Sequence, residues 1–218
     1  MRMLSGSLAV FAFAALIAAA LPRGIADLRA FEARQFIRTW ENRSAAAPAA
    51  DWEHARDALL QARELDARHP GYLEDLALLY EYRGLRAAPG PAREDFALAL
   101  ELLRAEAARR PSSSYTWAGI ALLKARMGAP DAEYETALRN AMALGPWEPP
   151  VQLAVADAGL RYWNRLAPDT SAALRANLTR SLRWQDRGIF DLARRLGRLD
   201  VICATPGVSR SPLARSCI

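Results

Sequence analysis

The sequence is poor in the residues that usually build catalytic and metal-binding sites. It contains two histidines, His54 and His69, and two cysteines, Cys203 and Cys217. Neither histidine lies in an H-E-x-x-H motif, the cysteines do not form a C-x-x-C pair, and the chain has no phosphate-binding glycine loop or G-x-S-x-G turn. The common signatures of zinc proteases, dithiol oxidoreductases and phosphate-binding enzymes are therefore missing. We expect no metal ion, no cofactor and no catalytic residue.

One enzymatic alternative stays open. A glycosidase needs only two suitably placed carboxylates, and the chain has 24 acidic residues. Carboxylates on helices more often form solvated faces, so we interpret the chain as a non-enzymatic protein.

β-branched residues are also sparse, whereas alanine, leucine and arginine dominate. This composition favours an all-α fold. The net charge of +5 is uneven, because the nine arginines from Ser171 onward face three aspartates, a local excess of +6. A basic C-terminal third suits anionic lipid heads, an acidic glycan or an acidic protein partner. The alternative is that these arginines are solvated on amphipathic helices. We expect no nucleic-acid partner.

Charged residues are absent from residues 4–21, which follow Arg2 and precede Pro22 and Arg23. The run is just long enough for a membrane-spanning anchor of about 17 to 25 residues. It also satisfies the apolar core and small-residue exit of a cleaved signal peptide. Both interpretations place the rest of the chain on the far side of a membrane. There, Cys203 and Cys217, at the edges of a Pro/Gly/Ser-rich tail, are expected to form a disulfide, which would contribute about 3 kcal/mol for a loop of this length.

The sequence contains a degenerate internal repeat. Two segments share the same order and spacing of residue types, which is large, large, small, long and glycine: Leu73, Leu76, Ala77, Tyr80 and Gly84, then Trp117, Ile120, Ala121, Lys124 and Gly128. Stripes of helical spacing flank them at Ala55, Leu59 and Ala62, at Ala99, Leu103 and Glu106, and at Tyr134, Leu138 and Ala141. Leu59 to Leu103 and Leu73 to Trp117 are both 44 residues apart, and Leu103 to Leu138 and Trp117 to Gln152 are both 35.

These spacings resemble tetratricopeptide (TPR) repeats, whose unit is about 34 residues, with an insertion near residues 85–91. Each helix pair would bury its apolar stripe against its neighbours and leave a concave groove lined by the first helix of each pair. The predicted partner-binding groove consists of Glu74, Leu78, Glu81, Leu122, Arg126, Asp157 and Arg161. Trp147, in a rigid Gly-Pro-Trp-Glu-Pro-Pro turn, is a possible aromatic anchor for a sugar or a protein. The alternative is that Trp147 packs across the junction between the two helices that this turn connects.

The predicted organisation is all-α, with an N-terminal transmembrane or signal helix before a TPR-like solenoid. We expect a signal anchor or signal peptide at 1–22, a membrane-proximal helix and linker at 23–50, the repeat region at 51–166, capping helices at 167–199 and an extended tail at 200–218. In the membrane-proximal helix, residues 25–41, we expect Leu28, Phe36 and Trp40 to face inward.

Three segments carry a resemblance to a known family. They are YLEDL with YEYR at 72–83, PSSSYTW at 111–117 and LGPWEPPVQLA at 144–154. Together they resemble the VpsP-like polysaccharide-biosynthesis proteins of bacterial exopolysaccharide gene clusters. The resemblance implies a non-enzymatic component of the bacterial inner membrane, single-pass and with the bulk of the chain in the periplasm, or soluble in the periplasm after signal cleavage. It brings no active-site residues.

The expected function is a membrane-tethered scaffold that holds protein partners of exopolysaccharide biosynthesis or export. Two alternatives stay open. One is a similar envelope adaptor for pilus assembly or cytochrome maturation, and the other is a protein that binds or cleaves the polysaccharide itself.

Overall fold

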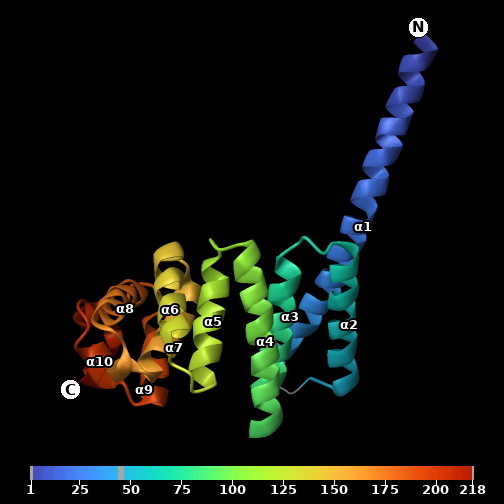
Figure 1. Cartoon of the computed structure of the whole chain (residues 1–218). Coiled ribbons are helices and arrows are strands. Elements are labelled where there is room, and N and C mark those ends of the chain that lie inside the picture. The colour runs from blue at the N-terminus through green and yellow to red at the C-terminus, as the bar shows by residue number, and fades with distance from the viewer. Residues whose placement is uncertain (1, 44–46, 218) are drawn as a thin grey trace. The chain divides into compact units, whose positions relative to one another are not determined.

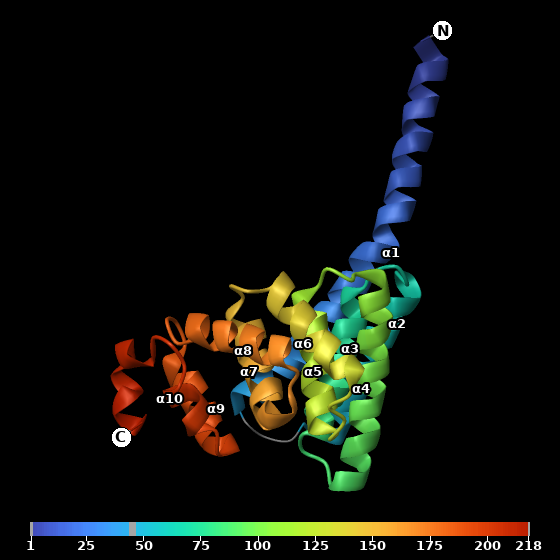
Figure 2. The ribbon, with the colours of Figure 1, turned by 60° about the vertical axis from the view of Figure 1, so that its left-hand side comes forward.

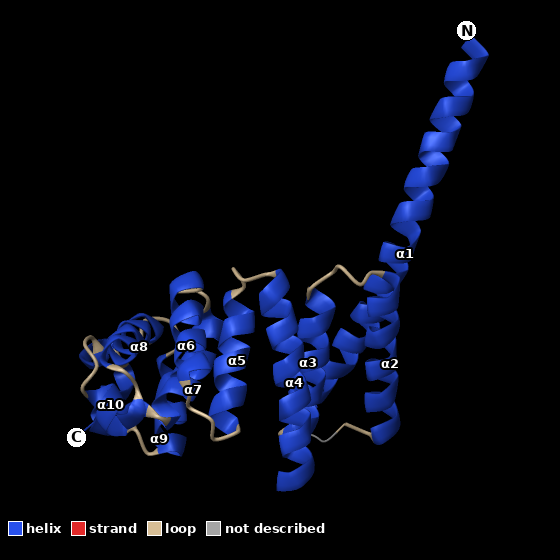
Figure 3. Ribbon diagram, viewed as in Figure 1, coloured by secondary structure: helices blue, strands red, loops and turns tan. Residues whose placement is uncertain are grey.

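The computed structural model describes residues 2–43 and 47–217, and within these ranges it leaves out the side chains of residues 2–12 and 41–43. All regular secondary structure in these ranges is helical (Figure 3). The all-α prediction is therefore confirmed. The chain divides into two compact units, Met1–Ala99 and Leu100–Ile218, which are described separately below. The division falls inside helix α4 (Pro89–Arg109).

Helix α1 (Arg2–Arg43) opens the first unit and continues through Pro22. A proline inside a helix removes the amide hydrogen bond to the carbonyl four residues earlier. Next to it, the Arg23 guanidinium donates a hydrogen bond of 2.9 Å to the Ala19 carbonyl. The segments expected at 1–22 and 25–41 are thus parts of one helix, whose N-terminal half projects beyond α2 and α3 of the same unit (Figure 1). No helix in the described ranges combines the length and the hydrophobicity that crossing a membrane requires.

The C-terminal half of α1 packs along α2 (Ala49–Leu65) through a stripe of small residues. Ala26, Ala30 and Ala33 are fully buried, so the two backbones lie close together. The prediction that Leu28 faces inward is wrong, because its side chain is 69 % exposed. Helix α3 (Gly71–Gly84) completes the packing, and Trp52 of α2 donates a hydrogen bond of 3.2 Å from its indole to the Leu79 carbonyl.

Polar contacts fix α1 against α3. Tyr72 donates from its hydroxyl to Asp27 Oδ1 at 2.7 Å, and Arg34 Nη2 lies 2.7 Å from Asp75 Oδ2. Burial raises the pKa of Asp75, while the hydrogen bond from Arg34 opposes that rise.

In the second unit, the helices α5, α6 and α7 each contact the next two helices along the chain. Helix α5 (Ser114–Arg126) contacts α6 (Ala132–Leu144) and α7 (Pro149–Arg161), and α6 contacts α7 and α8 (Pro168–Ser181). Helix α7 also contacts α8 and α9 (Asp186–Leu196), and it lies among these helices in Figure 2. Ser113 and Asp131 cap α5 and α6 by accepting backbone hydrogen bonds, which satisfies amides that lack a helical partner.

The C-terminal segment is compact rather than extended, which corrects the expected extended tail at 200–218. After Gly197, which ends α9 in the left-handed conformation, the chain forms α10 (Leu199–Cys203), η2 (Val208–Arg210) and η3 (Pro212–Cys217). A disulfide joins Cys203 to Cys217, with Cα atoms 5.5 Å apart. This crosslink closes residues 203–217 into a loop, and the Thr205 hydroxyl of this loop donates to the Val201 carbonyl of α10.

Candidate functional site

Three helices of the second unit form a groove of about 440 Å3. They are α5, α7 and α9; α5 contacts α7, and α7 contacts α9. The groove contains leucines and both signs of charge, and its lining residues are Leu122, Arg126, Pro150, Leu153, Ala154, Asp157, Gly188, Asp191, Leu192 and Arg195. Three residues of the predicted groove, Leu122, Arg126 and Asp157, therefore line one hollow.

The charges of this groove are partly paired along their own helices. Asp157 Oδ1 lies 2.7 Å from Nε of Arg161, one helical turn later. Arg161 was also predicted for the groove, but it does not line the hollow. Asp191 Oδ1 lies 2.8 Å from Arg194 Nη1. Between the charges, Leu153 is 37 % exposed. A groove of exposed leucine and mixed charge suits a protein segment that has an apolar face and polar flanks.

The sequence did not predict the contribution of α9 to this groove. Leu192 and Arg195 belong to the region that was expected to cap the array at 167–199. Ile189, Leu192 and Leu196 have the spacing of one face of a helix, but this spacing does not indicate which other helix lies beside it. The contact between α7 and α9 supplies that information.

The other predicted groove residues belong to the first unit. Glu74, Leu78 and Glu81 lie on α3 with spacings of four and three, so they share one helical face. Leu78 is 39 % exposed, and both glutamates are partly exposed.

Most side chains predicted to pack the repeat are buried. The turns before α5 and α7 are each held by the same kind of hydrogen bond. Trp117 donates from its indole nitrogen to the Pro111 carbonyl at 2.7 Å. Gln152 donates from its amide nitrogen to the Pro146 carbonyl at 2.8 Å. In both cases the acceptor lies six residues before the donor, so two chemically different side chains hold equivalent turns at the starts of α5 and α7.

A charged network connects α4, α5 and α6 within the second unit. Glu133 Oε2 lies 2.7 Å from Arg104 Nη2 and 2.7 Å from the buried Lys124 Nζ, which also lies 2.7 Å from Asp131 Oδ2. Hydrogen bonding to Arg104, together with Lys124, lowers the pKa of Glu133 to about 2, although burial opposes the shift. The network has a structural role, since every member is held by another.

Trp147 is exposed rather than packed into the junction. Its side chain is 64 % exposed, and the guanidinium carbon of Arg180 lies 5.7 Å from the centre of its ring. Arg180 also donates to the Pro146 carbonyl at 3.1 Å, which holds it beside the indole. The structure thus places an aromatic face and a cation together on the surface.

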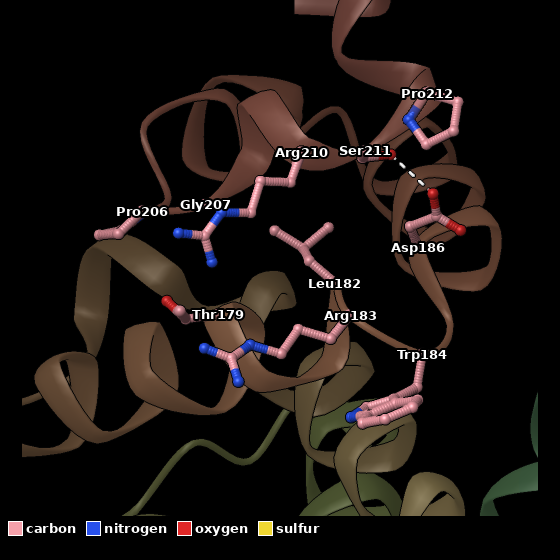
Figure 4. A pocket seen from close by; sticks show the side chains of 10 residues that line it. All are labelled: Thr179, Leu182, Arg183, Trp184, Asp186, Pro206, Gly207, Arg210, Ser211 and Pro212. Atoms are coloured by element: carbon pink, nitrogen blue, oxygen red, sulfur yellow. Dashed lines mark hydrogen bonds between the residues drawn. The ribbon is translucent and has the colours of Figure 1, made fainter.

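A second hollow, of about 490 Å3, lies between the end of α8 and the disulfide-closed segment (Figure 4). Arg183 and Arg210 reach it from opposite sides, and Trp184 at its edge is 75 % exposed. Asp186 Oδ2 accepts a hydrogen bond of 2.7 Å from the Ser211 hydroxyl and so ties the two sides together. Sequence reasoning noted the excess of arginine but missed this pocket, because its two sides are distant in sequence.

The histidines and carboxylates of the described ranges do not assemble into a metal site. No group of three or more histidine, cysteine, aspartate or glutamate side chains there is placed to hold a metal ion. His54 Nε2 lies 2.8 Å from Glu32 Oε1 on the surface, and His69 stacks on Tyr72 with ring centres 4.4 Å apart.

The sequence matches no protein-family model and none of the curated proteins. The class of this protein is therefore described from its fold and from the groove and pocket on its surface. It is an all-α chain that has a partly apolar groove across α5, α7 and α9 and a separate basic and aromatic pocket at its C-terminal end.

Proposed function

We propose that this chain is a TPR-like scaffold that binds protein partners of exopolysaccharide biosynthesis or export at the periplasmic face of the inner membrane. The observation that carries the scaffold role is the groove across α5, α7 and α9, with exposed leucine between opposite charges. Such a surface binds a protein segment by apolar burial and sets its orientation by charge.

The repeat architecture in this proposal is supported by the packing of the second unit. Helices α5, α6 and α7 each contact the next two helices, as stacked helix pairs do. The matching contacts of Trp117 and Gln152 give a second, independent sign of equivalence, because they recur at the predicted spacing of 35 residues.

The polysaccharide and the membrane enter the proposal from the sequence. The three segments at 72–83, 111–117 and 144–154 resemble the VpsP-like proteins, and residues 4–21 lack charge after Arg2. The N-terminal helix would hold the scaffold at the membrane, and the folded units would face the periplasm.

Deletion of the gene, followed by rescue with the full-length chain, tests this function. We expect the deletion to lower secreted exopolysaccharide and the rescue to restore it, with normal pilus assembly and normal levels of c-type cytochrome. Normal polysaccharide with a defect in pili or cytochromes would instead support the corresponding envelope adaptor and overturn the polysaccharide role.

A further inference from the structure

The C-terminal pocket contains two cations without a protein counter-charge. The guanidinium groups of Arg183 and Arg210 are exposed, and neither has an ion pair within residues 2–43 and 47–217. Figure 4 shows both side chains extending into the same hollow. Planar guanidinium groups bind carboxylates through paired hydrogen bonds.

The one carboxylate that lines the pocket is already engaged by neighbouring groups. Asp186 Oδ1 accepts from the Arg187 amide at 2.7 Å, and Oδ2 accepts from the Ser211 hydroxyl at 2.7 Å. Asp186 therefore positions the C-terminal segment. The pocket keeps a net positive charge, which favours an anionic ligand.

One exposed indole lines the same pocket. It belongs to Trp184, whose side chain is 75 % exposed. Flat aromatic faces that are exposed to water stack on the apolar faces of sugar rings. The aliphatic side chains of the lining are Leu182, which is 7 % exposed, and the short rings of Pro206 and Pro212, so the lining has little that would insert into a lipid bilayer.

We infer that this pocket binds an acidic oligosaccharide, with Arg183 and Arg210 on the carboxylates of successive sugars and Trp184 stacked on a ring. The inference rests on the proposed function in one respect, because the export role is what would bring an acidic polymer to this site. The scaffold would then contact its protein partners through the α5, α7 and α9 groove and the polymer through the C-terminal pocket.

The disulfide is part of this site. Arg210, Ser211 and Pro212 all lie within the loop that Cys203 and Cys217 close, so the crosslink holds one wall of the pocket beside the start of α9. Opening the disulfide loosens that wall, which then keeps only noncovalent contacts such as the hydrogen bonds of Ser211 to Asp186 and of Arg194 to Ser216. The site is therefore complete only in the oxidised protein.

Titration of the purified full-length chain with an acidic hexasaccharide and three comparison probes tests the site. The probes are hexagalacturonate, neutral maltohexaose, hexaglutamate and vesicles of phosphatidylglycerol. We expect hexagalacturonate to bind at least tenfold more tightly than each of the others and to weaken with added salt. Tighter binding of hexaglutamate or of the vesicles, or no binding of hexagalacturonate, would overturn the inference.

Variants locate the binding. Arg183→Gln and Arg210→Gln should each weaken hexagalacturonate binding by roughly tenfold, the loss expected for a hydrogen bond to a charged group. Trp184→Ala should weaken it by up to roughly tenfold, and the Cys203→Ser/Cys217→Ser variant should weaken it as well. Arg93→Gln removes one exposed charge from the first unit and is the control. An equal loss in Arg93→Gln would show nonspecific attraction and would contradict the site.

The outcomes separate this inference from the proposed function. If hexagalacturonate does not bind but polysaccharide output still depends on the gene, the pocket assignment fails and the scaffold role stands. If hexagalacturonate binds as expected but output does not change on deletion, the export role fails and the pocket assignment stands.

Discussion

At the scale of single residues, Glu133 is the centre of the charged network in the second unit. It contacts Arg104 of α4 and Lys124 of α5, and both contacts lower its pKa from the ordinary 4.5 to about 2. Because the unfolded chain keeps the ordinary pKa, it takes up the proton first as pH falls. The stability that Glu133 contributes is complete above pH 4.5 and is lost as the pH falls toward 2.

Glu133→Gln should therefore make the stability of the protein depend less on pH between pH 4.5 and 2. The variant is expected to be less stable than wild type at pH 7, because Lys124 loses one of its two partners, and the gap should narrow between pH 4.5 and 2. Melting temperatures across this range provide the measurement, with Glu94→Gln on an exposed position of α4 as the control. Parallel curves for Glu133→Gln and wild type would contradict the assignment.

Two polar residues at predicted packing positions of the repeat are explained by their contacts. Lys124 occupies an apolar stripe, and it is buried because Asp131 and Glu133 pair with its amine. Gln152 replaces a large apolar residue and makes the same kind of turn contact as Trp117. A sequence pattern predicts size and spacing, but it does not show the hydrogen-bond partner that makes a polar residue acceptable inside.

At the scale of helices, the buried stripe of α2 gives a direct test of the predicted register. Leu59 is fully buried, whereas its neighbour Leu60 is 39 % exposed. We expect Leu59→Ala to cost about 2 to 5 kcal/mol, as for other buried leucines. Leu60→Ala, the matched control, should change stability by only about 0.5 kcal/mol. Denaturant unfolding measures both, and equal losses would show that the stripe has been misplaced.

Helical periodicity predicted most elements but not every packed face. The stripes of α2, α3, α5 and α6 follow from spacing, since one side of each helix collects the large apolar residues. In α1 the buried stripe consists of Ala26, Ala30 and Ala33 before Ile37 and Trp40, and the large Leu28 beside the alanines points to solvent. Close helix packing selects small residues there, so a rule that assigns large residues to the interior fails. The same limit applies to α9, whose place in the groove depends on a contact between helices.

At the scale of the whole molecule, the disulfide and the proposed location must agree. Disulfides persist in oxidising compartments such as the periplasm, and Cys203 is joined to Cys217. An alkaline phosphatase reporter fused after Ile218, active only after export, should therefore be active. In the same cells, both cysteines should react with a thiol reagent only after reduction. An inactive reporter with two reactive thiols would contradict the periplasmic location.

The chemistry of the C-terminal pocket also emerges only at this scale. Its walls come from residues 179–186 and 206–212, and the disulfide brings the second wall into place. The sequence predicted the pairing of the cysteines and the local excess of arginine. It did not show that Arg183 and Arg210 face one hollow, because that depends on how the closed loop lies beside the start of α9.

The central claim is that the chain acts by binding through the α5, α7 and α9 groove. A binding surface spreads its energy over several contacts, whereas removal of a catalytic acid or base costs roughly a hundredfold or more in rate. The most direct measurement is secreted exopolysaccharide, beside protein abundance, in strains that carry groove variants. Asp157→Ala and Arg126→Ala, made singly, should each retain most of the output. The combined Leu122→Glu/Leu153→Glu variant should abolish it at normal abundance, and Leu144→Glu, at a leucine of α6 that is 45 % exposed and outside the groove, should not change it. Full output from the combined variant, or complete loss from one alanine, would contradict this account.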